Sequence, residues 1–214
     1  MYNKFSRLQK ILEVGGTIFG LAILLSSTSG CEGGNFNPFL MANHPLYTES
    51  ELEFDSDLVG AWIDESGETK FVFEKVSDTQ YGLTVIEKEG EKEESGKFEA
   101  HLIHLGAFEI VDFYPNPLSE GSEFFRSHFL RAHTFARVSV SRDEVEFRFL
   151  SGEWFSKRLK DKSVDTAYEE LGGTPVLTGT TEEVQRFVDR YSNDDEAFPD
   201  PLKMTRQNIE EELE

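Results

Sequence analysis

The stretch from Phe129 to Val138, FLRAHTFARV, carries the side chains best suited to binding an anion. In an extended chain alternate side chains share a face, so Arg131, His133 and Arg137 lie on one face and small apolar residues on the other. If the charged face lines an interior, a ligand carboxylate can supply the anionic partner that buried cations need. If the small apolar face points to the core instead, the three residues form a cationic stripe on the outside. The second arrangement agrees better with the usual burial of apolar faces.

The histidines are poorly spaced for a shared metal ion. His101 and His104 are three residues apart, which in a strand sends them to opposite faces, and His128 and His133 are also an odd number apart. Zinc needs ligands that converge on one point, so no metal site and no cofactor are expected. The sequence motifs of hydrolases, metalloproteases and phosphate-binding loops are missing as well, which favours a protein that is not an enzyme.

The single cysteine, Cys31, follows the pattern of an export signal. Three basic residues precede an apolar run from Val14 to Leu25, and the small residues Ser26 to Gly30 come next. This run of 12 residues is shorter than the roughly 20 that a membrane-spanning helix needs. A lone cysteine in an exported protein has no internal disulfide partner, so it needs another role.

Residues 28–31, Thr-Ser-Gly-Cys, resemble the lipobox of bacterial lipoproteins. The resemblance implies that a signal peptidase cuts before Cys31 and that the cysteine then carries acyl chains of the palmitate type, which anchor the protein to membrane lipid. Cleavage after Ser29 by the ordinary signal peptidase is the alternative. In that family an aspartate after the cysteine can retain the protein at the inner membrane. Here the residue is Glu32, so the implied location is the cell envelope, at the outer membrane if the cell has two.

The net charge is strongly negative and restricts the possible partners. It is −20 for the whole chain, and it becomes −22 once residues 1–30, with three basic residues and one acidic residue, are removed. Such a body repels phosphate backbones, so nucleic acid is not expected as a partner. Residues 126–160 carry eight basic and four acidic residues. An anionic ligand or an envelope protein is therefore expected to contact this segment.

The composition divides the chain into four parts: a lipoprotein signal peptide (1–30), a tether (31–56), a β-barrel domain (57–206) and an acidic tail (207–214). From Leu58 to Leu150 apolar residues alternate with polar ones, and turn signals separate about seven strands. This mainly β pattern is typical of an antiparallel meander that folds into a barrel or a sandwich. The 19 phenylalanines supply large apolar side chains for its core.

Two short helices are expected after these strands. Residues 152–162 place apolar side chains near one stripe. Residues 178–191 add a capping signal at Thr180 or Thr181 before apolar residues at helical spacing. Residues 174–179, TPVLTG, predict a short strand between the helices, and residues 202–206, LKMTR, can add a last strand.

Gly60-x-Trp62, in LVGAW, resembles the G-x-W motif of lipocalins and of bacterial lipocalin-like lipoproteins. The resemblance in pattern covers residues 58–191. It implies a meander β-barrel in which the tryptophan closes one end and an arginine stacks on it, with Arg148 and Arg158 as candidates. It also implies a cup able to hold an apolar molecule.

Two functional hypotheses follow from these features. The first is a membrane-anchored envelope lipoprotein that binds a small apolar or amphiphilic ligand through Trp62, Arg131, His133 and Arg137, without catalysis. The second is an envelope lipoprotein with a solid barrel core that has a structural role or contacts other proteins. The volume of the barrel interior separates the two hypotheses.

Overall fold

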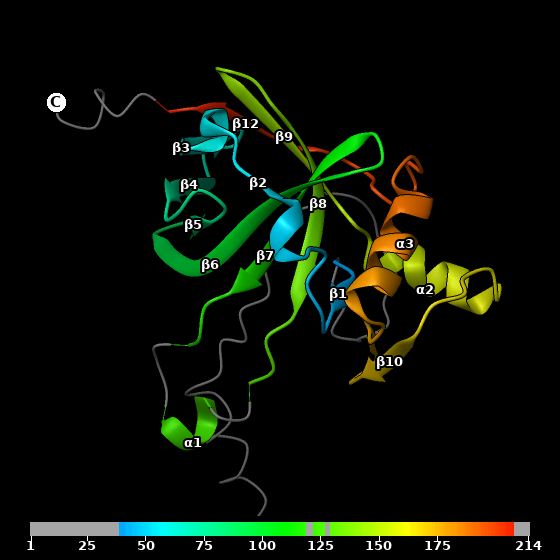
Figure 1. Ribbon diagram of the computed structural model, residues 1–214. Coiled ribbons are helices and arrows are strands. Elements are labelled where there is room, and N and C mark those ends of the chain that lie inside the picture. The colour runs from blue at the N-terminus through cyan, green and yellow to red at the C-terminus, as the bar shows by residue number, and fades with distance from the viewer. Residues whose placement is uncertain (1–38, 119–121, 127–128, 208–214) are drawn as a thin grey trace, which may run out of the picture. The chain divides into compact units, whose positions relative to one another are not determined.

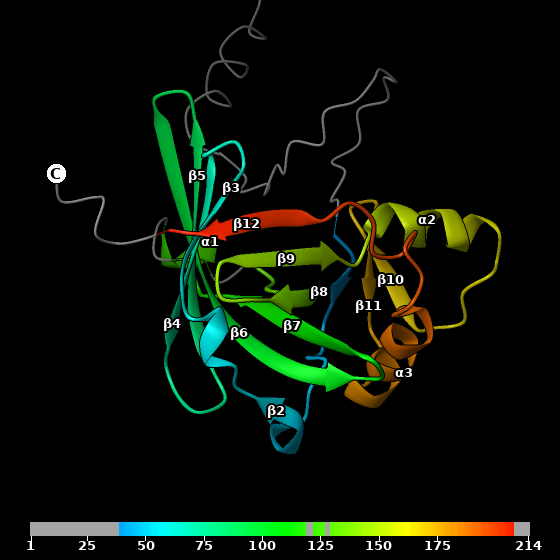
Figure 2. The same ribbon diagram turned by 90° about the horizontal axis from the view of Figure 1, so that it is seen from above.

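The computed structural model describes residues 39–118, 122–126 and 129–207. Their centre is a closed antiparallel β-barrel (Figures 1 and 2). Its strands are, in order around the barrel, β3 (Gly60–Asp64), β4 (Thr69–Lys75), β5 (Tyr81–Glu89), β6 (Lys92–Leu105), β7 (Phe108–Pro115), β8 (His133–Val140), β9 (Glu144–Phe149) and β12 (Leu202–Arg206). The predicted signal peptide (1–30), the predicted lipidation site Cys31 and the acidic tail after Gln207 lie outside the described residues.

The meander predicted from the alternation is confirmed. The seven strands from β3 to β9 follow one another around the barrel, each antiparallel to the next. The predicted last strand, β12, lies between β9 and β3 and pairs with both. The eighth strand therefore closes the barrel, although some fifty residues separate it from β9 in the sequence.

Phenylalanine rings meet across the barrel interior. The ring centroid of Phe147 on β9 lies 5.6 Å from that of Phe71, 6.0 Å from that of Phe73 and 6.1 Å from that of Phe113. Phe71 and Phe73 belong to β4, which β3 and β12 separate from β9. All four rings are buried. At this level the interior is filled by side chains from opposite walls.

A second apolar core lies outside the barrel, against the outer faces of β6, β7 and β8. It is covered by the helices α2 (Gly152–Lys160) and α3 (Thr181–Tyr191), which lie on one side of the barrel with the strands β10 (Tyr168–Leu171) and β11 (Thr174–Leu177) (Figures 1 and 2). The barrel contributes Ile103, Ile110 and Phe135 to this core. The two predicted helices are thus present, and Thr180 caps α3 through a capping box with Glu183.

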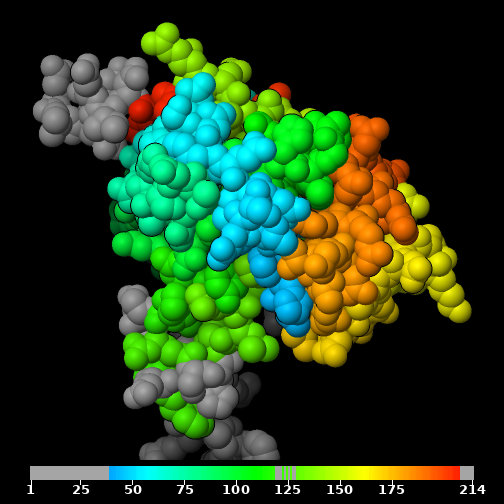
Figure 3. All heavy atoms as spheres, viewed as in Figure 1, coloured from blue at the N-terminus to red at the C-terminus, as the bar shows by residue number. Residues whose placement is uncertain are grey.

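The segment expected as a tether, residues 31–56, belongs to the folded body from Phe39 onward. Its elements are β1 (Met41–Ala42), the 3₁₀ turn η1 (Glu49–Glu51), β2 (Leu52–Glu53) and the start of η2 (Ser56–Leu58). β1 pairs with both β8 and β11, and Leu40 and Leu46 are fully buried in the outer core. Figure 3 shows this segment against α3, whose Gln185 donates a hydrogen bond to the carbonyl of Leu46. The absence of periodicity in this segment reflects short elements that each pack on the barrel.

One barrel end is closed by an arginine that lies over the tryptophan of the G-x-W motif. The guanidinium of Arg206 lies 4.1 Å from the ring centroid of Trp62, which is fully buried. Arg206 also donates hydrogen bonds to the carbonyls of Val59, Asp57 and Arg142, and the Trp62 indole donates to the carbonyl of Leu58. The stacking arginine implied by the lipocalin resemblance is therefore Arg206. The expectation of Arg148 or Arg158 is wrong, because Arg148 pairs with Glu146 and Arg158 lies over the ring of Trp154 instead.

Gly60 leaves room for this arginine. Its φ of +138° disfavours other residues, and a Cβ atom there would lie 2.5 Å from a guanidinium nitrogen of Arg206. Gly67, in the β3–β4 turn, also has a positive φ of +76°, but a Cβ atom there would meet nothing within 4 Å.

Gly60→Ala is expected to lower the free energy of unfolding more than Gly67→Ala. Backbone strain at either position costs about 1–3 kcal/mol, and only Gly60→Ala also displaces Arg206 from Trp62. Urea denaturation followed by tryptophan fluorescence measures both effects. Equal losses in the two variants would show that Gly60 acts through its backbone alone.

Candidate functional site

The small residues of β8 face the barrel interior, and the charged residues face outward. Val138 pairs directly with the interior ring of Phe147, and Ala136 pairs with Val111 and Phe149, so these side chains share the inner face. This is the arrangement that the apolar pattern favoured. The predicted ligand-binding residues His133 and Arg137 consequently lie on the outer wall, and neither lines the interior.

The outer position does not leave Arg137 in solvent. Only 7% of its surface is exposed. The guanidinium donates hydrogen bonds to the carbonyl of Ser192 at 2.8 Å and to the carboxylate of Asp195 at 3.1 Å, and it lies between the rings of Phe108 and Phe198. The expected solvent-facing cationic stripe is therefore wrong at this residue, because the connection between α3 and β12 covers it. Arg137 ties that connection to the barrel.

His133 has an internal anionic partner. Its Nδ1 lies 2.7 Å from a carboxylate oxygen of Asp112, which is fully buried and also accepts a hydrogen bond from the backbone N–H of Leu46. The Tyr114 ring stacks on His133 with centroids 4.2 Å apart. The predicted binding residue Arg131 is exposed, and its guanidinium lies over the Tyr114 ring, 4.4 Å from the ring centroid. These contacts satisfy His133 and Asp112 without a ligand.

The Asp112 carboxylate affects a second aromatic residue. Burial and, next, the charge of Asp112 raise the pKa of Tyr47 to about 12. The Tyr47 ring in turn packs on His101, with centroids 4.5 Å apart, and His101 Nδ1 lies 3.0 Å from the carbonyl of Thr79. Tyr47 therefore stays neutral in this polar cluster on the outer wall.

A hollow of about 280 Å³ lies on the outer face beside Arg137. It is lined by Phe108, Arg137, Val138, Ser139, Glu146, Arg148 and Asp195. Two arginines here offer positive charge to an anion, but each already has a carboxylate partner: Arg148 contacts Glu146 at 2.6 Å, and Arg137 contacts Asp195. An anionic ligand would have to displace these internal partners.

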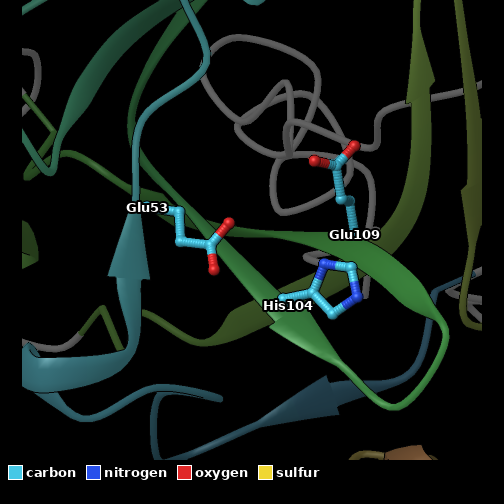
Figure 4. A group of neighbouring side chains, drawn as sticks. All are labelled: Glu53, His104 and Glu109. Atoms are coloured by element: carbon cyan, nitrogen blue, oxygen red, sulfur yellow. The ribbon is translucent and has the colours of Figure 1, made fainter.

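Three side chains that can ligate a metal lie close together (Figure 4). They lie at the barrel end where β6 turns into β7. His104 on β6 and Glu109 on β7 are direct cross-strand partners, and Glu53 comes from β2, which pairs with the same part of β6. Their ligand atoms all lie within 4.8 Å of one another. Sequence spacing between histidines missed this group because its other members are glutamates. Gly106, in the turn between β6 and β7, was the available sequence signal, since this turn sets His104 opposite Glu109.

The chain matches no protein-family model, and comparisons with curated proteins and with solved structures give no significant match either. Among the described residues no helix is long and apolar enough to cross a membrane.

Arg137→Ala is expected to lower the free energy of unfolding by about 2–3 kcal/mol, because buried carbonyl groups lose charged hydrogen-bond donors. Arg131→Ala removes an exposed cation from the same strand region and should cost less than about 1 kcal/mol. Chemical denaturation of the two variants makes the comparison. Equal small losses of unfolding free energy in the two variants would contradict the conclusion that Arg137 holds the α3–β12 connection against the barrel.

Proposed function

We propose that this protein is a non-enzymatic lipoprotein of the cell envelope whose solid barrel serves as a scaffold for contacts with other envelope proteins. The observation that carries the proposal is the meeting of Phe71, Phe73, Phe113 and Phe147 across the barrel interior. A ligand entering the barrel to the depth of Trp62 would have to displace these rings. The two buried residues of the predicted cationic stripe, His133 and Arg137, also have anionic partners within the protein: Asp112 for His133 and Asp195 for Arg137.

Lipid attachment is supported by the signal pattern and the lone Cys31. The body begins at Phe39, whose ring centroid lies 4.7 Å from that of Phe149. The eight residues from Cys31 to Phe39 can span at most about 29 Å. A lipid on Cys31 would therefore keep the barrel close to the bilayer, where its partners would be other envelope proteins.

The connection between β7 and β8 offers the contact surface that fits this role best. It contains α1 (Glu123–Arg126). Its described residues include Phe124, of which 78% is exposed, Leu130, of which 83% is exposed, and the exposed cation of Arg131. Elsewhere in the basic segment 126–160, four cations form ion pairs with carboxylates: Arg137, Arg148, Lys157 and Arg158. The basic and apolar groups of the loop therefore suit an acidic, partly apolar protein surface.

A second candidate function is binding of a small amphiphile at the barrel end opposite Trp62. There the interior-facing side chains of Phe98, Phe149 and Leu202 are only half-buried. Glu87 and Glu94 are cross-strand partners near this end, and burial, followed by the charge of Glu94, raises the pKa of Glu87. Two carboxylates favour a neutral or cationic amphiphile over the fatty acid that an arginine-lined interior would select.

Native mass spectrometry of the mature protein purified from its own source separates the two candidates. The scaffold proposal predicts no retained small molecule in the wild-type protein. Phe147→Ala should lower stability by about 3–5 kcal/mol and open a cavity that takes up small apolar molecules, whereas the exposed Leu130→Ala should do neither. A stoichiometric neutral or cationic amphiphile on the wild-type protein would favour the second candidate.

Lipidation is tested by metabolic labelling with palmitate. The wild-type chain should incorporate label and fractionate with membranes, and Cys31→Ser should lose both properties while keeping the same far-ultraviolet circular dichroism. Equal labelling of the two chains would contradict attachment at Cys31, and an unlabelled wild-type chain whose mature N-terminus is Gly30 would favour ordinary signal cleavage.

A further inference from the structure

We propose that Glu53, His104 and Glu109 form a binding site for a divalent transition metal, with Zn²⁺ as the ion that fits best. Within the described ranges they are the one group of three histidine, cysteine, aspartate or glutamate residues whose ligand atoms come this close together. The proposal is independent of the scaffold function, because it concerns the barrel rim at the β6–β7 turn and involves neither the phenylalanine core nor the β7–β8 connection.

The backbone holds all three residues in place. β5 pairs with β6 only as far as Ala100. Beyond that residue, β2 pairs with the same edge of β6, with Leu52 opposite Ile103 and Glu53 opposite Leu102. On the other side of β6, the hairpin pairs His104 with Glu109. The three side chains thus come from three adjacent strands rather than from a loop (Figure 4), and strand-mounted ligands are positioned more reliably than loop-mounted ones.

The charges of the group call for a cation. Two carboxylates and an imidazole lie within 4.8 Å of one another, yet in the part of the chain that the structure describes no ion pair or hydrogen bond engages these side chains. Other carboxylates in the same body have cationic partners: Asp195 has Arg137, and Asp194 and Glu196 have Arg158. A bound divalent ion would offset the repulsion between Glu53 and Glu109.

The donor set selects the ion. Calcium takes six to eight oxygen ligands, and magnesium also prefers oxygen, whereas imidazole suits zinc and its neighbours in the first transition row. Zinc is commonly held by three histidine or carboxylate ligands at about 2.0–2.2 Å with a fourth position open. Ligand atoms then lie roughly 3.4 Å apart, so the side chains must close by about an ångström from the present 4.8 Å limit. Glu53 and His104 are exposed, so changes of their side-chain torsions can supply this closure while the strands stay in place.

Isothermal titration of the full-length protein in detergent with ZnCl₂ tests the site. One Zn²⁺ per chain should bind saturably, and His104→Ala should weaken binding at least tenfold. His44→Ala is the matched control, because it removes an exposed histidine that is not part of the group, and it should leave the affinity unchanged. Absence of saturable binding, or equal affinity in the wild-type protein and His104→Ala, would overturn the site and leave only diffuse attraction to the acidic surface.

The absorption spectrum of Co²⁺ gives a second readout that does not depend on affinity. The wild-type protein should produce the intense visible bands of a low-coordinate cobalt site, and the double variant Glu53→Gln, Glu109→Gln should lose them. Far-ultraviolet circular dichroism should be the same for both proteins, since Glu53 is exposed and Glu109 half-buried. A weak six-coordinate spectrum identical in both proteins would also overturn the proposal.

Discussion

The contact between Arg206 and Trp62 is the constraint on which the rest of the barrel depends. It joins β12, the last strand of the barrel, to β3, the first. The guanidinium also donates hydrogen bonds to the carbonyls of Val59 and Asp57, which belong to the turn covering this end. The arginine can approach so closely because Gly60 has no side chain. Beyond this contact, β12 is held in the barrel by its hydrogen bonds to β3 and β9 and by the buried side chain of Met204.

The closed barrel also supports a second apolar core on the outside of its wall. Strands β6, β7 and β8 present apolar residues on both faces, because their inner faces line the barrel and their outer faces pack under α2 and α3. Polar groups that are buried in such a shared wall need hydrogen-bond partners within the protein. Asp112 and His133 meet that requirement together. The two terminal nitrogens of Arg137 meet it through Ser192 and Asp195, while its buried Nε has no partner among the described residues. The residues that looked most suited to a ligand are therefore used to join the two layers.

The sequence predicted local features well and distant partners poorly. Alternation predicted the strands because each strand has one face in the barrel, and the capping residues around Thr180 predicted α3. The interior direction of Ala136 and Val138 followed from ordinary apolar burial. The covering of Arg137 could not be predicted, because its partners lie more than fifty residues away. For the same reason Arg206 was missed as the partner of Trp62, and Glu53 as a neighbour of His104.

A double-mutant cycle between Trp62 and Arg206 tests the central claim most directly. The free energy of unfolding is measured for the wild-type protein, Trp62→Phe, Arg206→Met and the double variant. Tyr114→Leu and Arg131→Met form a reference cycle for a pair whose arginine is exposed. The buried contact predicts a coupling energy of about 1–2 kcal/mol for Trp62 and Arg206, larger than that of the reference pair. A coupling energy below about 0.3 kcal/mol would show that the two residues act independently, and that the barrel is closed by strand pairing alone.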